Sequence, residues 1–192
     1  MTRLIVMPDT DPMSTLIDTT DVATIAEHLG ALGIDFEQWV TPVNLRHGAD
    51  QDDVLAAYAD DVARISASGG YITVDVVRLA RFDETDAQWK DKAATSRERF
   101  LAEHTHADDE VRFFVEGGGA FYLRVDGRVH IVCCEAGDLL MVPAGTRHWF
   151  DMGTDPAFAA IRFFRIPEGW VGDFTGDGIA SRFASYDTLL AR

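Results

Sequence analysis

The sequence predicts a mainly β fold with flanking helices, in which short antiparallel strands close into a barrel or a double-sheet roll. Between residues 111 and 150, runs rich in β-branched and aromatic residues alternate with tight-turn signals. The dipeptide Asp126-Gly127 separates two of these runs and is the strongest short hairpin signal. None of the runs has a helical period, so the second half of the chain is predicted to be built from strands.

The strands of this second half follow from the turns that separate them. Turn residues lie at 116–119, 126–127, 135–138 and 143–146, where Gly, Asp and Pro adopt the conformations that tight turns need. The predicted strands are VRFFV (111–115), AFYLRV (120–125), RVHIVCC (128–134), LLMV (139–142) and RHWF (147–150). Antiparallel barrels bring the start of one strand beside the end of a later one, so residues 104–110 and residue 148 are predicted to meet at one mouth.

The first half of the chain alternates short strands with amphipathic helices. One helical pattern follows the capping run Thr19-Thr20-Asp21, and a second ends at Gly69-Gly70. The predicted elements are a strand over 3–7, a helix over 21–32, a strand over 33–39, a helix over 51–68, a strand over 71–79 and a helix over 85–100. We expect one domain over residues 1–192, with a helical lead-in over about residues 1–100 and a β-barrel core over about residues 71–166.

The composition is that of an ordinary globular protein with a strong acidic balance. Of the 192 residues, 47% are hydrophobic and 26% are charged, as in an average folded domain. The formal net charge of −15 argues against nucleic acid or an anionic membrane surface as a partner. The N-terminal residues do not form a signal peptide and no apolar run approaches a membrane span, so a cytoplasmic protein is expected. The sequence does not fix the oligomeric state, and we take a monomer as the expectation.

Four side chains suited to a metal ion stand at informative distances. His104 and His106 are two residues apart, so on an extended strand both imidazoles leave the same face. Glu110 follows after Ala-Asp-Asp, a composition suited to a bend that swings the carboxylate back toward the rings. His148 comes from the strand expected at the same mouth. Nitrogen ligands with one carboxylate suit a divalent first-row transition metal, whereas magnesium and calcium prefer oxygen.

The other three histidines are predicted to take no part in this site. His28 falls in an amphipathic helix and His47 in a polar loop, and both are expected at the surface. His130 falls on the strand 128–134, but no partner stands at ligand spacing from it.

The spacing of these residues resembles the two sequence motifs of the cupins. The first is His104-x-His106-x3-Glu110-x6-Gly117, and the second is Gly137-x5-Pro143-x-Gly145-x2-His148. Two positions depart from the cupin pattern: Glu98 stands where a glycine is usual and Met152 where an asparagine is usual. Neither position supplies a ligand, so the resemblance implies an intact site.

Within the cupins, the chain resembles the acireductone dioxygenase family of methionine salvage. The resemblance is carried by Glu103-His104-x-His106, Asp109-Glu110-x-Arg112-Phe113, Gly117-Gly118-Gly119-Ala120-Phe121, Pro143-Ala144-Gly145-Thr146-x-His148-x-Phe150 and the later Trp170. It implies a double-stranded β-helix (jelly-roll barrel) and one Fe(II) or Ni(II) per chain, held by the three histidines and the glutamate. It also implies cleavage of 1,2-dihydroxy-3-keto-5-methylthiopentene by O2. The iron form of such an enzyme gives 4-methylthio-2-oxobutanoate and formate, and the nickel form gives 3-methylthiopropanoate, formate and carbon monoxide.

Arg112 is predicted to face the metal because it lies two residues after Glu110 on a strand. A buried guanidinium needs an anionic partner. That partner is either Glu110 itself or an oxyanion of the substrate. The resemblance favours the substrate and gives Arg112 a substrate-binding and catalytic role.

Aromatic and acidic residues flank the predicted ligands. Phe150 shares a strand face with the last histidine, and with Phe100 and Trp170 it would form an aromatic wall against an apolar substrate tail. The alternative is that these rings only fill the core. Glu103 and Asp109 flank the ligands and would either orient imidazoles or remain solvated acids.

Two other classes of function stay open at this stage. One is a different cupin dioxygenase or isomerase that uses the same ligands on another small molecule. The other is a non-catalytic cupin that binds a ligand as a sensor or store. All four ligand positions are filled, which favours an enzyme. The ligand set accepts iron and nickel alike and so does not choose the metal.

Overall fold

The computed structural model describes residues 1–40, 45–46, 48–80 and 88–191. The strands of this part of the chain are β1 (Arg3–Pro8), β2 (Ile17–Thr19), β3 (Asp35–Gln38), β4 (Thr73–Leu79), β5 (His104–Thr105), β6 (Glu110–Glu116), β7 (Gly118–Val125), β8 (Arg128–Glu135), β9 (Asp138–Val142), β10 (Arg147–Asp151), β11 (Phe158–Phe164) and β12 (Asp173–Phe174). The helices are α1 (Val22–Gly30), α2 (Gln51–Ala57), α3 (Ala59–Gly69), α4 (Trp89–Leu101), the 3₁₀-helix η1 (Gly178–Arg182) and α5 (Tyr186–Leu190). No helix in these ranges is long and apolar enough to cross a bilayer.

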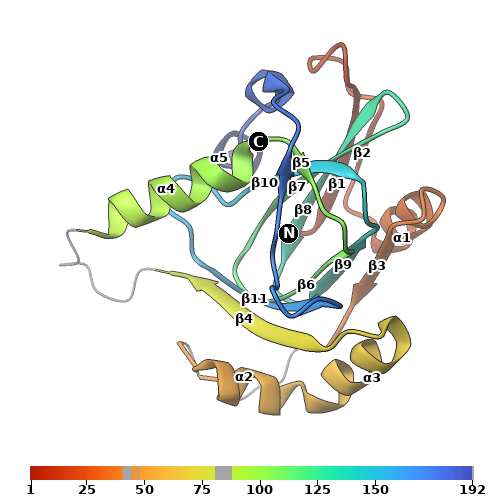
Figure 1. The fold of residues 1–192 in the computed structure, drawn as a ribbon. Helices are drawn as coiled ribbons and strands as arrows, with labels where there is room; N and C mark the ends of the chain where they lie inside the picture. The colour runs from red at the N-terminus through yellow and green to blue at the C-terminus, as the bar shows by residue number, and fades with distance from the viewer. Residues whose placement is uncertain (41–44, 47, 81–87, 192) are drawn as a thin grey trace.

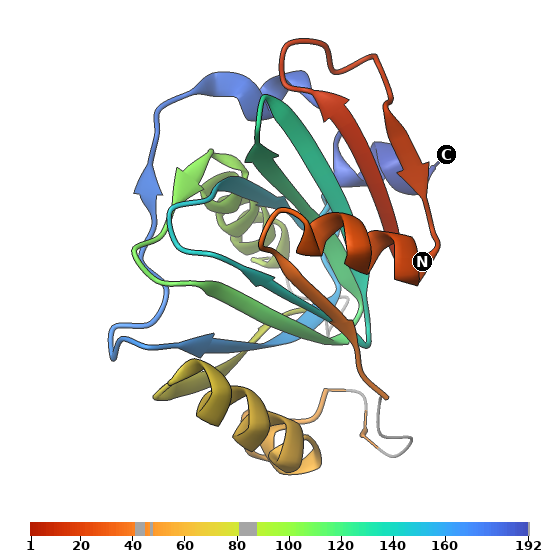
Figure 2. The same cartoon turned by 90° about the vertical axis from the view of Figure 1, so that its right-hand side faces the viewer.

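The described strands form two antiparallel sheets that face each other (Figure 1). One sheet has the strand order β12-β5-β10-β7-β8-β1-β2 and the other has the order β3-β9-β6-β11-β4. The view in Figure 2 shows α2 and α3 outside the second sheet, next to β4. The predicted mainly β fold with flanking helices is thereby confirmed.

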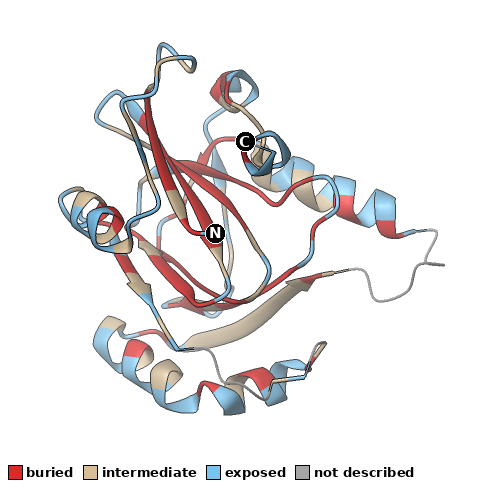
Figure 3. Cartoon of the chain, turned by 180° about the vertical axis from the view of Figure 1, so that it is seen from behind, coloured by how far each residue is buried: buried red, intermediate tan, exposed pale blue. Residues whose placement is uncertain are grey.

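Both faces of the central strands are buried, as the reds of Figure 3 show. Along β6, Phe114 points into the core between the sheets, whereas Val111 and Phe113 pack in the outer cluster under α2 and α3. On β10, Phe150 points inward and Trp149 packs outward against the residues of η1 and α5. This alternation follows from the two-residue period of a strand. It explains why these segments are nearly continuous apolar runs in the sequence.

The predicted turns of the second half are present. Asp126 and Gly127 both have positive φ, 51° and 69°, as a two-residue hairpin turn requires. The pair joins β7 to β8, whose register runs from Val125 opposite Arg128 to Gly118 opposite Glu135.

One predicted helix is two helices in the structure. The expected helix over 51–68 is interrupted at Tyr58, which has φ −112° and ψ 23° and separates α2 from α3. The interruption buries the Tyr58 ring edge-on against Phe113 at 4.8 Å between ring centroids. Burial of a large aromatic ring on the curved outer face of the sheet thus overrides continuous helical hydrogen bonding. The first residues of the expected helix over 85–100, and His47, lie outside the described residues.

The segment that we expected to be a helical lead-in also supplies strands to both sheets. β1 pairs with β8 along six residues, and β4 pairs with β11 along seven. β11, which is not among the predicted strands, lies between β6 and β4. The first hundred residues are therefore part of the sheet structure as well as a helical cover.

Helix α1 brings His28 to His130, contrary to our expectation that His28 lies free on the surface. His28 Nε2 lies 3.1 Å from His130 Nδ1, and His130 is 1% exposed. One ring must donate and the other accept, so the contact requires the accepting ring to be neutral and is lost when both rings are protonated. Burial, together with the charge of His28, lowers the pKa of His130 to about 4, and burial lowers the pKa of His28.

This pair makes the stability of the fold depend on pH. The pKa of His130 is lower in the folded chain than the value of about 6.5 expected after unfolding, so the unfolded chain binds the proton first. The stabilisation is present above pH 6.5 and is lost as the pH falls toward 4. Between pH 7.5 and pH 5, the free energy of unfolding should fall by about 1–2 kcal/mol more in the wild type than in His130→Gln. Urea denaturation of both proteins across this range measures the difference; parallel pH curves would contradict it.

Candidate metal centre

The structure brings His104, His106, Glu110 and His148 together at the mouth between the sheets. One nitrogen or oxygen atom from each lies within 4.8 Å of those of the other three, and all four side chains are buried. They come from separate segments: β5, the loop after it, the start of β6 and β10. Among the described residues, this is the group of histidine, cysteine and acidic side chains that could hold a metal ion.

Strand pairing and one loop contact place these residues. His148 and His104 are direct register partners in the pairing of β10 with β5, so their side chains leave the same face. The backbone N–H of Gly145 donates to the carbonyl of His106 at 2.9 Å. This bond joins the loop that carries His106 to the turn that leads into β10.

Each imidazole is oriented by a backbone carbonyl. The Nδ1 atoms of His104, His106 and His148 donate to the carbonyls of Ala102, Val171 and Thr146 at 2.7, 2.5 and 2.8 Å. A carbonyl only accepts, so the proton resides on Nδ1 and the lone pair of each neutral ring is on Nε2. The three Nε2 atoms therefore present metal-binding lone pairs, in the arrangement usual for metal-bound histidines.

The carboxylate of Glu110 and the three imidazoles form a set of donor atoms that needs a cation between them. Its Oε2 lies 2.6 Å from Nε2 of His106 and 3.2 Å from Nε2 of His148. A carboxylate oxygen and a nitrogen lone pair repel at such distances unless a proton or a metal ion lies between them. The residues present thus fit a divalent transition metal.

Burial and neighbouring charges shift the pKa values of the site residues. Burial raises the pKa of Glu110, but Arg112 and the two imidazoles outweigh burial and hold it well below its ordinary value. Burial and the charge of His148 lower the pKa of His104 to about 4. Burial also acts to lower the pKa of His106, but the hydrogen bond to Glu110 and its charge outweigh this effect, so that pKa is raised. In the metal-free protein, a proton on His106 therefore competes with a metal ion.

Arg112 lies inside the barrel and is 2% exposed. Its Nη2 contacts Oε1 of Glu110 at 2.6 Å, the oxygen that faces away from the imidazoles. Its guanidinium carbon lies 5.5, 5.4 and 5.0 Å from the ring centroids of Phe100, Phe121 and Phe150. Within the described residues, the buried Nε of Arg112 has no hydrogen-bond partner. An unused buried donor beside Glu110 is the group that an additional anion would engage.

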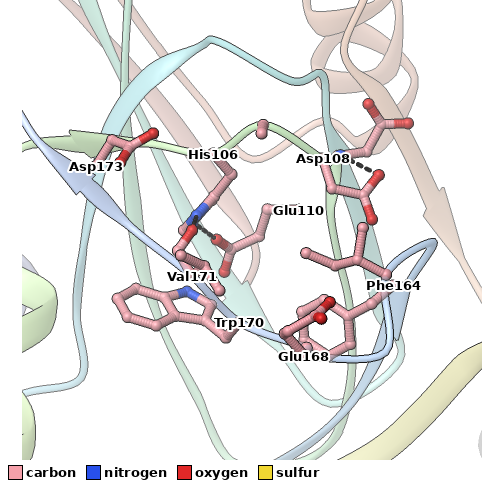
Figure 4. Close-up of a pocket in the computed structure, with 12 residues that line it drawn as sticks. His106, Asp108, Glu110, Phe164, Glu168, Trp170, Val171 and Asp173 are labelled. Atoms are coloured by element: carbon pink, nitrogen blue, oxygen red, sulfur yellow. Dashed lines mark hydrogen bonds and ion pairs between the residues drawn. The ribbon is translucent and has the colours of Figure 1, made fainter.

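A cavity of about 250 Å³ opens against His106 and Glu110 (Figure 4). Its apolar wall comes from Phe164, Ile166, Trp170 and Val171. The buried Nε1–H of Trp170 has no partner among the described residues.

The three aromatic residues predicted to form one wall divide into two groups. Trp170 lines the cavity and packs edge-on against the rings of His104 and His106. Phe100 packs between Trp170, at 5.1 Å, and the guanidinium of Arg112. Phe150 lies deeper, in the core between the sheets.

Glu103 and Asp109 do not contact an imidazole in the described structure. Glu103 is buried and accepts from Arg124 and from the hydroxyl of Thr175. Asp109 accepts from the backbone N–H of Ala144 at 3.0 Å. The orienting role, one of the two alternatives considered for these acids, falls to backbone carbonyls, which carry no signal in a sequence.

Comparison with known proteins agrees with this geometry. The model of the ARD/ARD′ family matches residues 3–172. An acireductone dioxygenase of Parvibaculum lavamentivorans is 56% identical over 188 residues, which are 98% of each chain. One from Frankia alni is 52% identical over 177 residues, which are 92% of this chain and 85% of that protein.

A solved structure shares the fold. An acireductone dioxygenase from Bacillus anthracis, with a cadmium ion in its active centre, superposes with a TM-score of 0.75 at 28% identity. The match covers 91% of this chain and 98% of that one. Together with the family match over most of the chain, these similarities show that the protein belongs to the acireductone dioxygenase (ARD/ARD′) family.

Proposed function

We propose that this chain is a metal-dependent dioxygenase that cleaves 1,2-dihydroxy-3-keto-5-methylthiopentene with O2 in methionine salvage. The observation that carries the proposal is the buried set of three imidazoles and one carboxylate, in a chain that matches the family from residue 3 to residue 172. One Fe(II) or Ni(II) per chain would be held by His104, His106, Glu110 and His148. When bound, the metal supplies Lewis acidity and a template on which the oxygens of a deprotonated ene-diol converge.

The residues of the chain supply charge balance for an anionic substrate. Glu110 is the one carboxylate among the four donors, so the donor set keeps part of the positive charge of a divalent ion unneutralised. Arg112 adds a cation whose Nε is free to donate to a substrate oxyanion. Its position against three aromatic rings prevents it from swinging toward solvent. Arg112 is thus assigned to hold and orient the charged end of the substrate.

The cavity provides for the apolar end. Phe164, Ile166 and Trp170 give the space next to His106 and Glu110 an apolar lining, and a methylthio group would be buried there. Phe100 supports Trp170 from behind. An apolar lining that displaces water when substrate binds would strengthen the electrostatic contacts within the site.

Two other functions would use the same ligands: another small-molecule cupin reaction, or ligand binding without turnover. Loss of the ultraviolet chromophore of acireductone in air, measured with and without protein, separates the three. Rapid loss with O2 uptake supports the proposal, and binding without turnover supports a store or sensor. A cytoplasmic location and a monomeric state remain predictions from the sequence.

Replacing one ligand should remove the metal. His148→Ala should lower metal affinity by more than about 100-fold, because changing groups that merely orient a ligand already costs 10–100-fold. Metal content by mass spectrometry and turnover measure this. His130→Gln, which alters a buried histidine on β8 outside the site, should keep one metal per chain. Full metal content in folded His148→Ala would contradict the ligand assignment.

Arg112→Ala should keep the metal and weaken acireductone binding by about 1.5–3 kcal/mol, the contribution of a hydrogen bond between charged groups. This corresponds to a rise in substrate dissociation constant of about 10–150-fold. Arg162→Ala is the matched control, because Arg162 is the register partner of Arg112 on β11 and bonds Asp75 instead. If Arg112→Ala loses metal and binds substrate normally, Arg112 serves to hold Glu110.

The products should follow the metal. Three neutral nitrogens and one carboxylate discriminate poorly between Fe(II) and Ni(II), so one apoprotein should accept either ion. Iron-loaded protein should give 4-methylthio-2-oxobutanoate and formate, and nickel-loaded protein 3-methylthiopropanoate, formate and carbon monoxide. The measurement is product analysis from one batch of acireductone after metal stripping and separate reloading. Equal yields of carbon monoxide from both forms would show that the pocket decides the products.

A further inference from the structure

Arg165 occupies the position directly after β11 and is bonded to the loop between two of the proposed ligands. Its backbone N–H donates to Asp108 at 2.5 Å, and its Nη1 donates to the other oxygen of the same carboxylate at 2.9 Å. The same Nη1 lies 2.7 Å from Asp109. Asp108 and Asp109 are the last two residues before Glu110 and follow His106 by two and three positions.

The far side of the guanidinium is fixed as well. Nε of Arg165 donates to the carbonyl of Gly69 at 2.7 Å, and the guanidinium carbon lies 4.7 Å from the centre of the Tyr71 ring. The hydroxyl of Tyr71 donates to Asp109 at 3.3 Å. The planar fork of one arginine therefore ties the ligand loop to the end of α3 and the segment that leads into β4.

Asp109 extends this connection to the segment that carries the last ligand. Its second carboxylate oxygen accepts from the backbone N–H of Ala144 at 3.0 Å. Ala144 lies in the turn that leads into β10, and its neighbour Gly145 donates to the carbonyl of His106. Two bonds thus hold the 106–110 loop to the 143–148 turn.

The chain after Arg165 returns to the site. Ile166 and residues 168–171 line the cavity, and at their end the carbonyl of Val171 accepts from Nδ1 of His106. The cavity wall is therefore joined to the loop that carries the ligands at both of its ends, through Arg165 at the start and Val171 at the end.

An exposed ion pair alone contributes little, but this one has features of a rigid connection. Asp108 is 9% exposed and each of its oxygens accepts from Arg165, one of them from its backbone. No group in this cluster touches the ligand atoms directly. Its effect on the site must act through the position of the loop.

We propose that Arg165 is a positioning residue that preorganises His106 and Glu110 for the metal through Asp108 and Asp109. The inference rests on the proposed metal site. Without the guanidinium, the loop keeps its sequence and its ligands but loses its attachment to α3 and the segment before β4. Ligand atoms that must be reordered on binding bind a metal more weakly.

The test is the affinity of the apoprotein for Ni(II) alone, by competition with a chromophoric chelator. Arg165→Ala should weaken Ni(II) binding by about 10–100-fold, the usual effect of groups that orient ligands. Arg165→Lys should restore part of the affinity, since it keeps the charge and loses the fork. Unchanged Ni(II) affinity, within twofold, in folded Arg165→Ala would overturn the proposal.

The matched control is Arg64→Ala. Arg64 also pairs with acids, Glu37 and Asp61, and lies 5.3 Å from the centre of the Trp39 ring, but it is on α3 away from the ligands. The Arg64→Ala protein should bind Ni(II) as tightly as the wild type does. An equal loss of affinity in Arg64→Ala would show that a general loss of stability explains the result and would overturn the proposal.

A second variant keeps the test valid if Arg165→Ala does not fold. Asp109→Asn leaves an oxygen for the N–H of Ala144 but removes the charge that faces Arg165. Asp109→Asn should weaken Ni(II) binding. Arg165→Lys should then lower the Ni(II) affinity by a smaller factor in the Asp109→Asn protein than in the wild type, because the two changes affect one contact. Fully additive losses would contradict the shared contact. Failure of wild-type protein to bind Ni(II) would instead refute the metal site itself.

Discussion

The buried charge of Glu110 is the constraint on which the rest of the structure depends. A carboxylate removed from water is strongly destabilising unless cations and hydrogen bonds surround it. Here Arg112 contacts one oxygen, and the Nε2 atoms of His106 and His148 face the other. Arg112 is itself buried and needs Glu110 in turn. The barrel must therefore place Glu110 and the side chains around it accurately, and it does so largely with paired strands.

Strand pairing positions three of the four proposed ligands, and loop contacts position the fourth. β5 and β10 fix His104 and His148 through direct register pairing, and β6 fixes Glu110 through its pairing with β9. His106 lies between strands, so its position depends on contacts of its loop. Those contacts are to backbone atoms at both ends: Gly145 donates to its carbonyl and Val171 accepts from its ring. The least regular part of the site is thus held by tertiary hydrogen bonds instead of strand pairing.

Much of the fold and of the site could be predicted from the sequence, for reasons that the structure makes clear. Turn residues with positive φ, such as Asp126 and Gly127, locate strand ends whatever the tertiary context. Ligand spacing on strands survives because the side-chain period of a strand is fixed. The interruption at Tyr58 could not be predicted, since it arises from packing against a residue 55 positions away. The same holds for Arg165, whose partners become neighbours only in the folded chain.

The bond from His106 to the carbonyl of Val171 connects metal chemistry to access to the site. The ring donates to the segment that forms the cavity wall, so any displacement of that wall removes the hydrogen bond that makes the imidazole a stronger base. Thermodynamic reciprocity then applies: a bound metal that strengthens this bond resists opening of the wall by the same free energy with which opening weakens metal binding. Substrate entry that displaces this wall would therefore be coupled to the affinity of the site for the metal ion.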